Sequence, residues 1–415
     1  MYKSSPGFIL GAILLLAACG SPQNGTTVGS ADSTTETVQN GTSVETKPPN
    51  TSYKPAFAGQ TRTAAVKTSA AYEGKILSDK LTKPWGITSL PDGRFLITQK
   101  AGVMRIATSA GELSDPITGI PAVNAAGQGG LLGLTIDPAF STNRMVYWSF
   151  SEKTDEGNLT AIAKGKLSAD DKKIENATVI YRATPGYKGV QHYGGRIIFD
   201  RSGNLFISTG ERSDPETRPQ SQWLNSGLGK VIHITTDGKP VANGPFATQA
   251  DARPEIYTYG HRNVQGLAIH PATGDLWENE FGPRGGDEVN LIQPGKNYGW
   301  PTITYGIEYG GPKIGEGITQ KDGMQQPVYY WDPVVSPSGM TFYNGNNMPE
   351  WKNNLFIAAL SGNHIVRLVI TNNKVVGEER ILPNEAQRFR DITQGTDGAL
   401  YAITEGGRLY RIAKK

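Results

Sequence analysis

The chain has 415 residues, a formal net charge of +3 and a single cysteine. Its basic residues are scattered along the sequence, which argues against nucleic acid as a partner because such binding needs a concentrated basic patch. One cysteine also excludes an intramolecular disulfide, so the folded part of the chain needs a large core for its stability.

The N-terminus has the pattern of a signal peptide. Lys3 precedes an unbroken run of small and apolar residues from Phe8 to Ala18. That run is too short to cross a hydrocarbon core of about 30 Å as a stable helix, so we expect it to be removed. Leu16–Cys19 resembles a bacterial lipobox, and an ordinary signal peptide with an incidental cysteine is the alternative. We therefore expect an exported protein, anchored to a bacterial membrane only by a lipid on Cys19 and facing the periplasm or the cell exterior.

Composition predicts a tether after the signal peptide. Residues 19–67 are rich in Ser, Thr, Asn, Gly and Pro and contain almost no large apolar side chains. Such a segment cannot bury enough apolar surface to offset its chain entropy, so we expect it to be disordered. The chain is thus divided into a signal peptide at 1–18, a tether at 19–67 and a folded domain at 68–415, a length that is usual for a closed repeat architecture.

A strand–turn–strand pattern recurs through the folded domain. Each unit has a small residue, an alternating apolar run, a turn and a second alternating run, which is typical of a β-hairpin. Six units begin near Trp85, Gly133, Gly195, Gly266, Gly339 and Arg390. Radial repetition of small sheets explains this regular spacing, so an all-β fold, a six-bladed β-propeller, is predicted. A pair of β-sandwiches or a β-helix fits the long variable loops less well.

Two of the loops suggest proton transfer and ligand binding. His192 opens a strand, and its imidazole titrates near neutrality, so it can accept a proton from a hydroxyl. A histidine that bonds the backbone of its own loop is the commoner case. Arg262 and Asn263 follow a glycine turn, and their donors suit a planar ligand that bears carboxylates or quinone oxygens. An ion pair between blades is the alternative for this arginine.

Three further clusters offer oxygen ligands, an amide and paired cations. The glycine-rich segment from Asn279 to Glu288 combines carboxylates with backbone carbonyls, which Ca²⁺ accepts readily, although the spacing is not that of an EF-hand and a plain turn is the alternative. Gln128 lies in a glycine loop. Arg388 and Arg390 alternate on a strand and therefore point the same way, as an anion clamp requires.

Together and in this order, these clusters resemble the PQQ-dependent aldose sugar dehydrogenases and soluble glucose dehydrogenases, the glucose/sorbosone dehydrogenase family. The likeness covers about Ile76 to Ile412 and is most specific from Tyr259 to Pro301. It implies that aldoses are oxidised at the anomeric carbon to lactones, with pyrroloquinoline quinone (PQQ) and Ca²⁺ as cofactors. It also implies a sugar as substrate and an external electron acceptor, a quinone or a cytochrome, since one cysteine leaves no motif for haem attachment. We expect a monomer.

The resemblance also assigns roles to residues. His192 is implied as the general base, and Arg262 as the group that stabilises charge on the reduced cofactor. The implied sugar contacts are Gln128, Tyr309 and Trp331; the implied PQQ contacts are Gln128, Arg262, Asn263, Arg388 and Arg390. The carbonyls of Gly282 and Pro283 are implied to hold the catalytic Ca²⁺, and Glu288 with the carbonyl of Tyr298 to hold a separate structural Ca²⁺.

Two positions depart from the family pattern. Ser361 stands where relatives carry a cofactor-binding lysine. Either the affinity for the cofactor is weakened, or His364 or Arg367 compensates. Gln191 stands where the glucose dehydrogenase branch has an aspartate, so we expect no adjacent carboxylate to orient the imidazole of His192.

Two other classes of propeller remain as alternatives. A calcium-dependent lactonase-type hydrolase needs side-chain Asn, Asp and Glu ligands along the propeller axis, whereas this sequence presents a Gly-Pro pair with flanking arginines. A non-catalytic propeller related to hedgehog-interacting proteins keeps the fold and loses the cofactor. Ser361 keeps this second alternative open. The residues that argue against it are His192, Gln128, Arg262 and Arg388.

Overall fold

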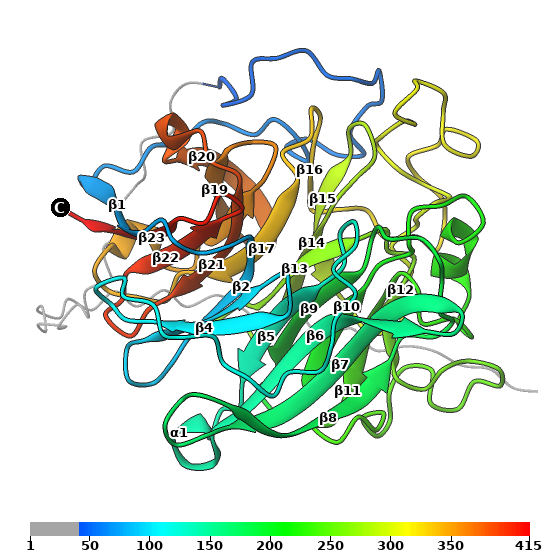
Figure 1. Cartoon of the computed structure of the whole chain (residues 1–415). Coiled ribbons are helices and arrows are strands. Elements are labelled where there is room, and N and C mark those ends of the chain that lie inside the picture. The colour runs from blue at the N-terminus through cyan, green and yellow to red at the C-terminus, as the bar shows by residue number, and fades with distance from the viewer. Residues whose placement is uncertain (1–40) are drawn as a thin grey trace, which may run out of the picture. The chain divides into compact units, whose positions relative to one another are not determined.

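The computed structural model describes residues 41–415, which form six antiparallel sheets arranged around an axis (Figure 1). This arrangement confirms the predicted six-bladed β-propeller. The first three blades in chain order are β2 (Pro84–Ser89), β3 (Phe95–Gln99) and β4 (Val103–Ala107); β5 (Leu131–Ile136), β6 (Met145–Thr154), β7 (Gly157–Leu167) and β8 (Ile174–Arg182); and β9 (Gly194–Phe199), β10 (Leu205–Thr209), β11 (Lys230–Ile234) and β12 (Ile256–Tyr259).

The other three blades complete the ring. They are β13 (Val264–Ile269), β14 (Leu276–Glu280), β15 (Asp287–Ile292) and β16 (Tyr329–Trp331); β17 (Pro337–Phe342), β18 (Leu355–Ala359), β19 (His364–Thr371) and β20 (Lys374–Ile381); and β21 (Phe389–Gln394), β22 (Leu400–Thr404) and β23 (Leu409–Lys414) with β1 (Tyr72–Ser78). The helical elements in the described part are short: α1 (Phe140–Asn143), η1 (Arg218–Gln222), η2 (Pro349–Trp351) and η3 (Pro383–Glu385). None of them is long and apolar enough to span a membrane.

The first strand of each hairpin unit lines the axis. These six inner strands contact one another in sequence around the ring. Space between them is so tight that a Cβ on Gly339 would lie 1.6 Å from Oδ1 of Asp391 on the next inner strand. The small residue that opens the repeated pattern is therefore required by close packing at the axis. Between neighbouring blades, apolar side chains such as Trp148 and Trp277 are completely buried and form the core.

The ring is closed by pairing the two ends of the folded domain. Strand β1 runs antiparallel to β23, with Tyr72 opposite Lys414 and Ile76 opposite Tyr410. The sixth blade thus combines the first strand of the chain with its last three. Closure of this kind leaves no long unpaired sheet edge between the first and last blades.

Residues 41–67, here called the strap, lie against the fourth and fifth blades. The carboxylate of Asp332 accepts hydrogen bonds from the backbone N–H groups of Asn50 and Thr51, at 2.8 and 2.9 Å. Gln60 is completely buried and donates to the carbonyl of Pro327 at 2.9 Å. The expectation of disorder is therefore wrong for this part of the tether, because polar contacts with the propeller replace the apolar burial that its composition lacks. Residues 1–40, with the expected signal peptide and Cys19, lie outside the described residues.

Candidate active site

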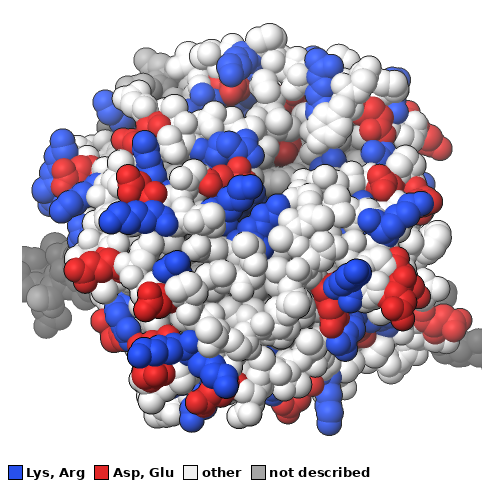
Figure 2. Space-filling model, viewed as in Figure 1, with Lys and Arg blue, Asp and Glu red and all other residues white. Residues whose placement is uncertain are grey.

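Loops at one end of the axis enclose a cavity of about 340 Å³. Its walls come from all six blades and combine an aromatic floor with basic groups. Lys and Arg side chains gather in the middle of the face that Figure 2 shows. The lining residues are Trp85, Lys100, Gly127, Gln128, Leu132, Tyr193, Gly194, Gln265, Phe281, Tyr309, Ser336, Leu360, Arg388, Arg390 and Glu405.

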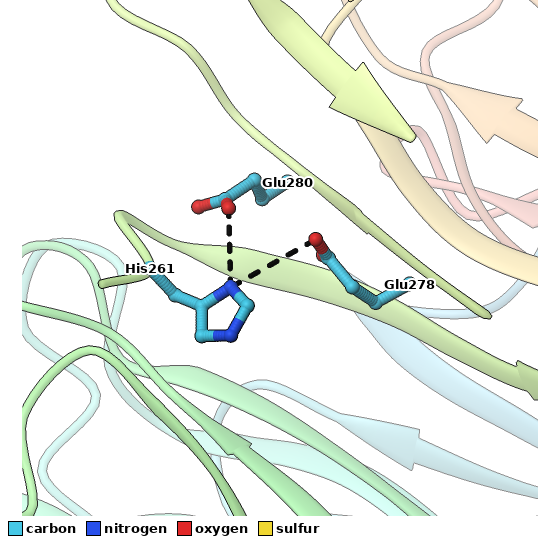
Figure 3. A group of neighbouring side chains, drawn as sticks. All are labelled: His261, Glu278 and Glu280. Atoms are coloured by element: carbon cyan, nitrogen blue, oxygen red, sulfur yellow. Dashed lines mark hydrogen bonds and ion pairs between the residues drawn. The ribbon is translucent and has the colours of Figure 1, made fainter. Parts of the chain in front are cut away.

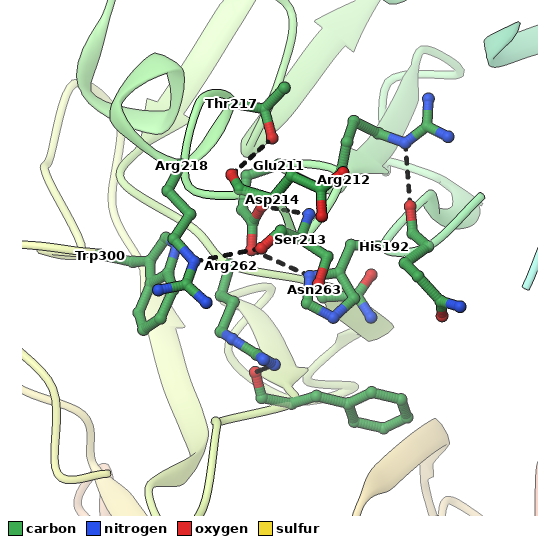
Figure 4. A network of polar contacts seen from close by, with 12 residues as sticks. His192, Glu211, Arg212, Ser213, Asp214, Thr217, Arg218, Arg262, Asn263 and Trp300 are labelled. Carbon is green, nitrogen blue, oxygen red and sulfur yellow. Dashed lines mark hydrogen bonds and ion pairs between the residues drawn. The ribbon is translucent and has the colours of Figure 1, made fainter. Parts of the chain in front are cut away.

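His192 lies directly before the lining residues Tyr193 and Gly194 and forms a hydrogen-bonded pair with Glu211 (Figure 4). Its Nδ1 is 2.9 Å from Oε1 of Glu211, and both side chains are buried. Because an ionised carboxylate only accepts hydrogen bonds, Nδ1 carries the proton and Nε2 keeps its lone pair. Nε2 makes no hydrogen bond with any residue that the structure describes. This is the arrangement that a general base needs.

The surroundings keep His192 uncharged and fixed. Burial lowers the pKa of its imidazole, the positive charge of Arg262 lowers it further, and Glu211 opposes both effects. The backbone of His192 has a φ of 43°, a left-handed conformation that costs a non-glycine residue about 1–3 kcal/mol. It is held there by Gln128, whose Oε1 accepts a hydrogen bond from the backbone N–H of His192 at 2.9 Å. Gln128 and His192 are thus brought together as expected.

Glu211 corrects the expectation that no carboxylate orients the imidazole. The prediction considered only the chain neighbour Gln191, which is exposed and does not contact the ring. Glu211 comes two residues after the end of β10, and β10 pairs antiparallel with β9, with Thr209 opposite Gly194. That hairpin register brings residues after β10 beside residues before β9. The signal was a carboxylate at a strand end in the same hairpin as the histidine.

Arg262 and Asn263 lie behind the cavity, each with an unpaired donor. The guanidinium of Arg262 donates to the carbonyls of Phe281 and Gly282 at 3.0 and 2.8 Å. Its Nε, and Nδ2 of Asn263, are buried without a partner among the described residues. A buried N–H group without a partner is costly. Neither residue lines the large cavity, although Arg262 lines the small chamber that shares Phe281 with it.

The four predicted metal-binding residues line one small chamber of about 10 Å³ that shares Phe281 with the larger cavity. The structure brings together Gly282, Pro283, Glu288 and Tyr298, which the sequence had divided between two calcium sites. The volume is close to the least that holds one water molecule, so the chamber has room for one ion. Glu280 also lines the chamber and was missed from the sequence.

Three buried groups lie close together, His261, Glu278 and Glu280, and Glu280 is the one that lines this chamber (Figure 3). Nδ1 of His261 is 3.2 Å from Oε1 of Glu280 and 3.8 Å from Oε1 of Glu278. Burial and the neighbouring charge of Glu280 raise the pKa of Glu278 and of Glu288 well above the usual range. Oε2 of Glu278 has no partner among the described residues. Such an excess of carboxylate oxygens suits a hard cation such as Ca²⁺.

Arg388 and Arg390 stand side by side on the cavity wall, as the alternation predicted. Both bind the carboxylate of Glu405, Arg388 through Nε at 2.6 Å. Arg390 is also 3.3 Å from Oε1 of Gln265, and its guanidinium lies over the ring of Trp85. One carboxylate shared by two guanidinium groups leaves a net positive charge on this wall.

Of the two aromatic residues predicted to contact the sugar, one lines the cavity and the other does not. Tyr309 lines the cavity and is 69% exposed, so it is free to contact a substrate. Trp331 is 4% exposed, donates through Nε1 to Glu378 at 3.2 Å and does not line the cavity, so its position gives no support to a sugar platform. All three residues of β16 are buried, and the ring of Trp331 packs in the core formed by the fourth and fifth blades.

The structure also tests the two residues proposed to replace the missing lysine. Ser361 binds Oγ of the lining residue Ser336 at 2.8 Å. His364 turns its Nδ1 to the carbonyl of Gly362, and Arg367 is buried in an ion pair with Glu379 at 2.7 Å. Neither lines the cavity. The expectation that His364 or Arg367 compensates for Ser361 is therefore wrong.

An ion pair crosses the axis below the cavity. Arg196 on β9 binds Asp391 on β21 at 2.7 Å, and the guanidinium of Arg196 lies 4.6 Å from the centre of the Trp85 ring. Asp391 also accepts a hydrogen bond from the backbone of Ile87 at 2.9 Å. This axial carboxylate is therefore occupied by an arginine, which argues against the metal-dependent lactonase alternative.

A propeller with a histidine–carboxylate pair beside a basic cavity fits a sugar dehydrogenase of the quinoprotein type, and the comparisons agree. Residues 81–411 match the family model "Glucose / Sorbosone dehydrogenase". Aldose sugar dehydrogenase YliI of Escherichia coli is 41% identical over 346 residues, 82% of this chain and 92% of that protein. The chain therefore belongs to the glucose/sorbosone dehydrogenase family and is an oxidoreductase.

Solved structures extend the likeness to the whole fold. The apo form of the soluble aldose sugar dehydrogenase from Escherichia coli matches with a TM-score of 0.79 and 40% identity, over 83% of this chain and all of that one. The PQQ-bound form of the aldose sugar dehydrogenase from Streptomyces coelicolor matches with a TM-score of 0.69 and 28% identity, over 84% of this chain and 100% of that one.

Proposed function

We propose that this protein oxidises aldose sugars at the anomeric carbon to lactones, with PQQ and Ca²⁺ as cofactors. The observation that carries the proposal is the His192–Glu211 pair beside a cavity lined by cations. The retained pair also argues against a non-catalytic propeller. An external acceptor, a quinone or a cytochrome, would then reoxidise the cofactor.

The residues that are present fit PQQ. The cavity of about 340 Å³ lies within the usual range for small-molecule sites. Arg388 and Arg390 provide a positive wall for carboxylates, and the buried donors of Arg262 and Asn263, which have no partner among the described residues, would pair with quinone oxygens that reach them. When bound, the quinone supplies a hydride acceptor for the anomeric carbon, and Ca²⁺ draws electron density from the quinone oxygen.

The residues of the small chamber fit Ca²⁺. Glu280 and Glu288 offer carboxylate oxygens in a space for one ion, and Gly282 and Pro283 lie on the same wall. Glu280 in turn accepts hydrogen bonds from the backbone N–H groups of Arg262 and Asn263. A cation in this chamber would therefore be coupled to the position of the two residues that face the quinone.

The chain's own part in the reaction is proton transfer and orientation. Nε2 of His192 takes the proton of the anomeric hydroxyl as the hydride leaves the anomeric carbon. Glu211 then stabilises the imidazolium through Nδ1. Gln128 holds the backbone of His192 and is exposed, so its amide also reaches a sugar hydroxyl. Tyr309 offers a ring face at the cavity mouth.

Reconstitution of the purified apo-protein tests the proposal. Titration with PQQ, followed by its absorbance, should reach saturation in the presence of Ca²⁺ and be weaker after chelation. The loaded protein should reduce an artificial dye with aldoses as electron donors. A protein that binds no PQQ, or that oxidises none of a broad panel of aldoses, would contradict the assignment.

We also propose that the protein is exported and anchored by a lipid on Cys19, as the lipobox pattern suggests. The full-length protein should fractionate with membranes, and Cys19→Ser should release it. A Cys19→Ser protein that stays with the membranes would remove the lipid anchor.

A further inference from the structure

Lys100 is a cation of the cavity without a carboxylate of its own. Arg388 and Arg390 share Glu405, whereas Nζ of Lys100 donates to the backbone carbonyl of Gly127. No carboxylate lies within ion-pair distance of Lys100 among the residues that the structure describes. Three cations of the cavity therefore face one carboxylate.

Other cations crowd this lysine. Burial lowers the pKa of Lys100, the positive charges of Lys83 and Arg390 lower it further, and the more distant charge of Glu405 only partly opposes them. Lys83, Lys100 and Arg390 also surround a side chamber of about 320 Å³ with Trp85 and Glu405. Like charges in such proximity repel one another, and an anion between them would remove that repulsion.

The position of Lys100 is fixed by its backbone. It follows β3, its N–H donates to the carbonyl of Lys83, and its carbonyl accepts from Leu131, both at 3.0 Å. A Cβ on Gly130 would lie 2.2 Å from the carbonyl oxygen of Lys100, so a glycine is required at this approach. The ammonium group is therefore presented from a rigid strand end, which reduces the entropy lost when it binds an anion.

PQQ carries three carboxylates, and the cavity offers two guanidinium groups and this ammonium. We propose that Lys100 binds a carboxylate of PQQ and so supplies the cation that Ser361 does not. The inference rests on the proposed function. It places the compensating charge on the first blade, next to the Gln128 loop, whereas the missing lysine belongs to the fifth blade.

Equilibrium binding of PQQ to the apo-protein with Ca²⁺ present tests the role of Lys100. Lys100→Gln removes the charge but keeps an N–H donor for the Gly127 carbonyl. It should raise the Kd of PQQ about 10- to 100-fold, the range for a hydrogen bond to a charged group. Because one ionic contact is lost, the Kd should also become less sensitive to salt.

Three controls make the result decisive. Lys83→Gln changes the same local charge outside the main cavity and should alter the Kd much less, while Lys100→Arg should restore tight binding. An unchanged Kd and salt dependence in Lys100→Gln, with the wild type binding PQQ, would overturn the role of Lys100 alone. Equal increases of the Kd in Lys83→Gln and Lys100→Gln would show that PQQ responds to the overall positive charge of this region. That result would also overturn the proposed contact between Lys100 and a PQQ carboxylate. A wild type that binds no PQQ would instead remove the proposed function.

Discussion

The two buried histidine–carboxylate groups of this protein differ in how their charges are balanced. His192 has one carboxylate, Glu211, whose other oxygen accepts a hydrogen bond from the backbone of Ser213. His261 lies between Glu278 and Glu280, with Glu288 close by, and its Nε2 is 2.8 Å from the hydroxyl of Thr258. The first group has a partner for each polar atom except the lone pair that the reaction needs.

The second group has more carboxylates than donors. Burial and repulsion raise the pKa of Glu278 and Glu288, so protons or a cation must neutralise them. The His192 pair is therefore balanced without a ligand, whereas the His261 group carries an excess of carboxylates that the proposed Ca²⁺ would neutralise. Each group can be altered separately, which makes the difference testable.

The largest effect on turnover is expected from the loss of the general base, His192. His192→Ala should reduce kcat about 10²- to 10⁴-fold, the usual contribution of general base catalysis, because no other group accepts the hydroxyl proton. The Kd of PQQ and the melting temperature with and without Ca²⁺ should change little, since the metal chamber is not touched. A His192→Ala variant with the same kcat as the wild type would show that His192 is not the general base.

A smaller effect is expected from Glu211→Gln, which leaves the imidazole in place without its counter-charge. Glu211 raises the pKa of His192 against burial, so its removal should move the acid limb of the kcat/KM profile to lower pH. At the plateau, kcat should fall about 10- to 100-fold because the imidazolium is no longer stabilised. A pH–rate profile measures both. An acid limb that stays in place would show that Glu211 has no electrostatic effect on the base.

At the metal chamber, the expected effect is on the thermal stability of the protein, which should depend on the cation. Saturating Ca²⁺ should stabilise the wild type by about 2.7 kcal/mol at one hundred times its Kd, so chelation should lower the melting temperature. Glu288→Gln should weaken that dependence on Ca²⁺. Glu308→Gln, which removes one side of the ion pair with Arg218 outside the chamber, is the matched control and should leave it intact. If the melting temperature of the wild type does not depend on Ca²⁺, the proposed metal site is refuted.

The sequence predicted the blades better than the details of the site. Each hairpin is local, so alternation and turn residues define it, and the six units recur in the structure. Glu211 was missed because its contact with His192 depends on strand register, not on adjacency in the chain. The burial of Trp331 was not predicted because all three aromatic residues of β16 lie in the interior, which depends on packing against distant strands. The strap was missed because its order comes from hydrogen bonds to Asp332 and other distant partners.

The pairing of β1 with β23 sets the order in which the protein can be completed. β1 is synthesised before the strands of the other five blades, whereas its partner β23 is synthesised after them. The sixth blade therefore assembles only after the other five have been made, and until then the ring has an open seam. Arg388 and Arg390 belong to this last blade. A chain truncated near its C-terminus thus loses ring closure and the cofactor clamp in one step.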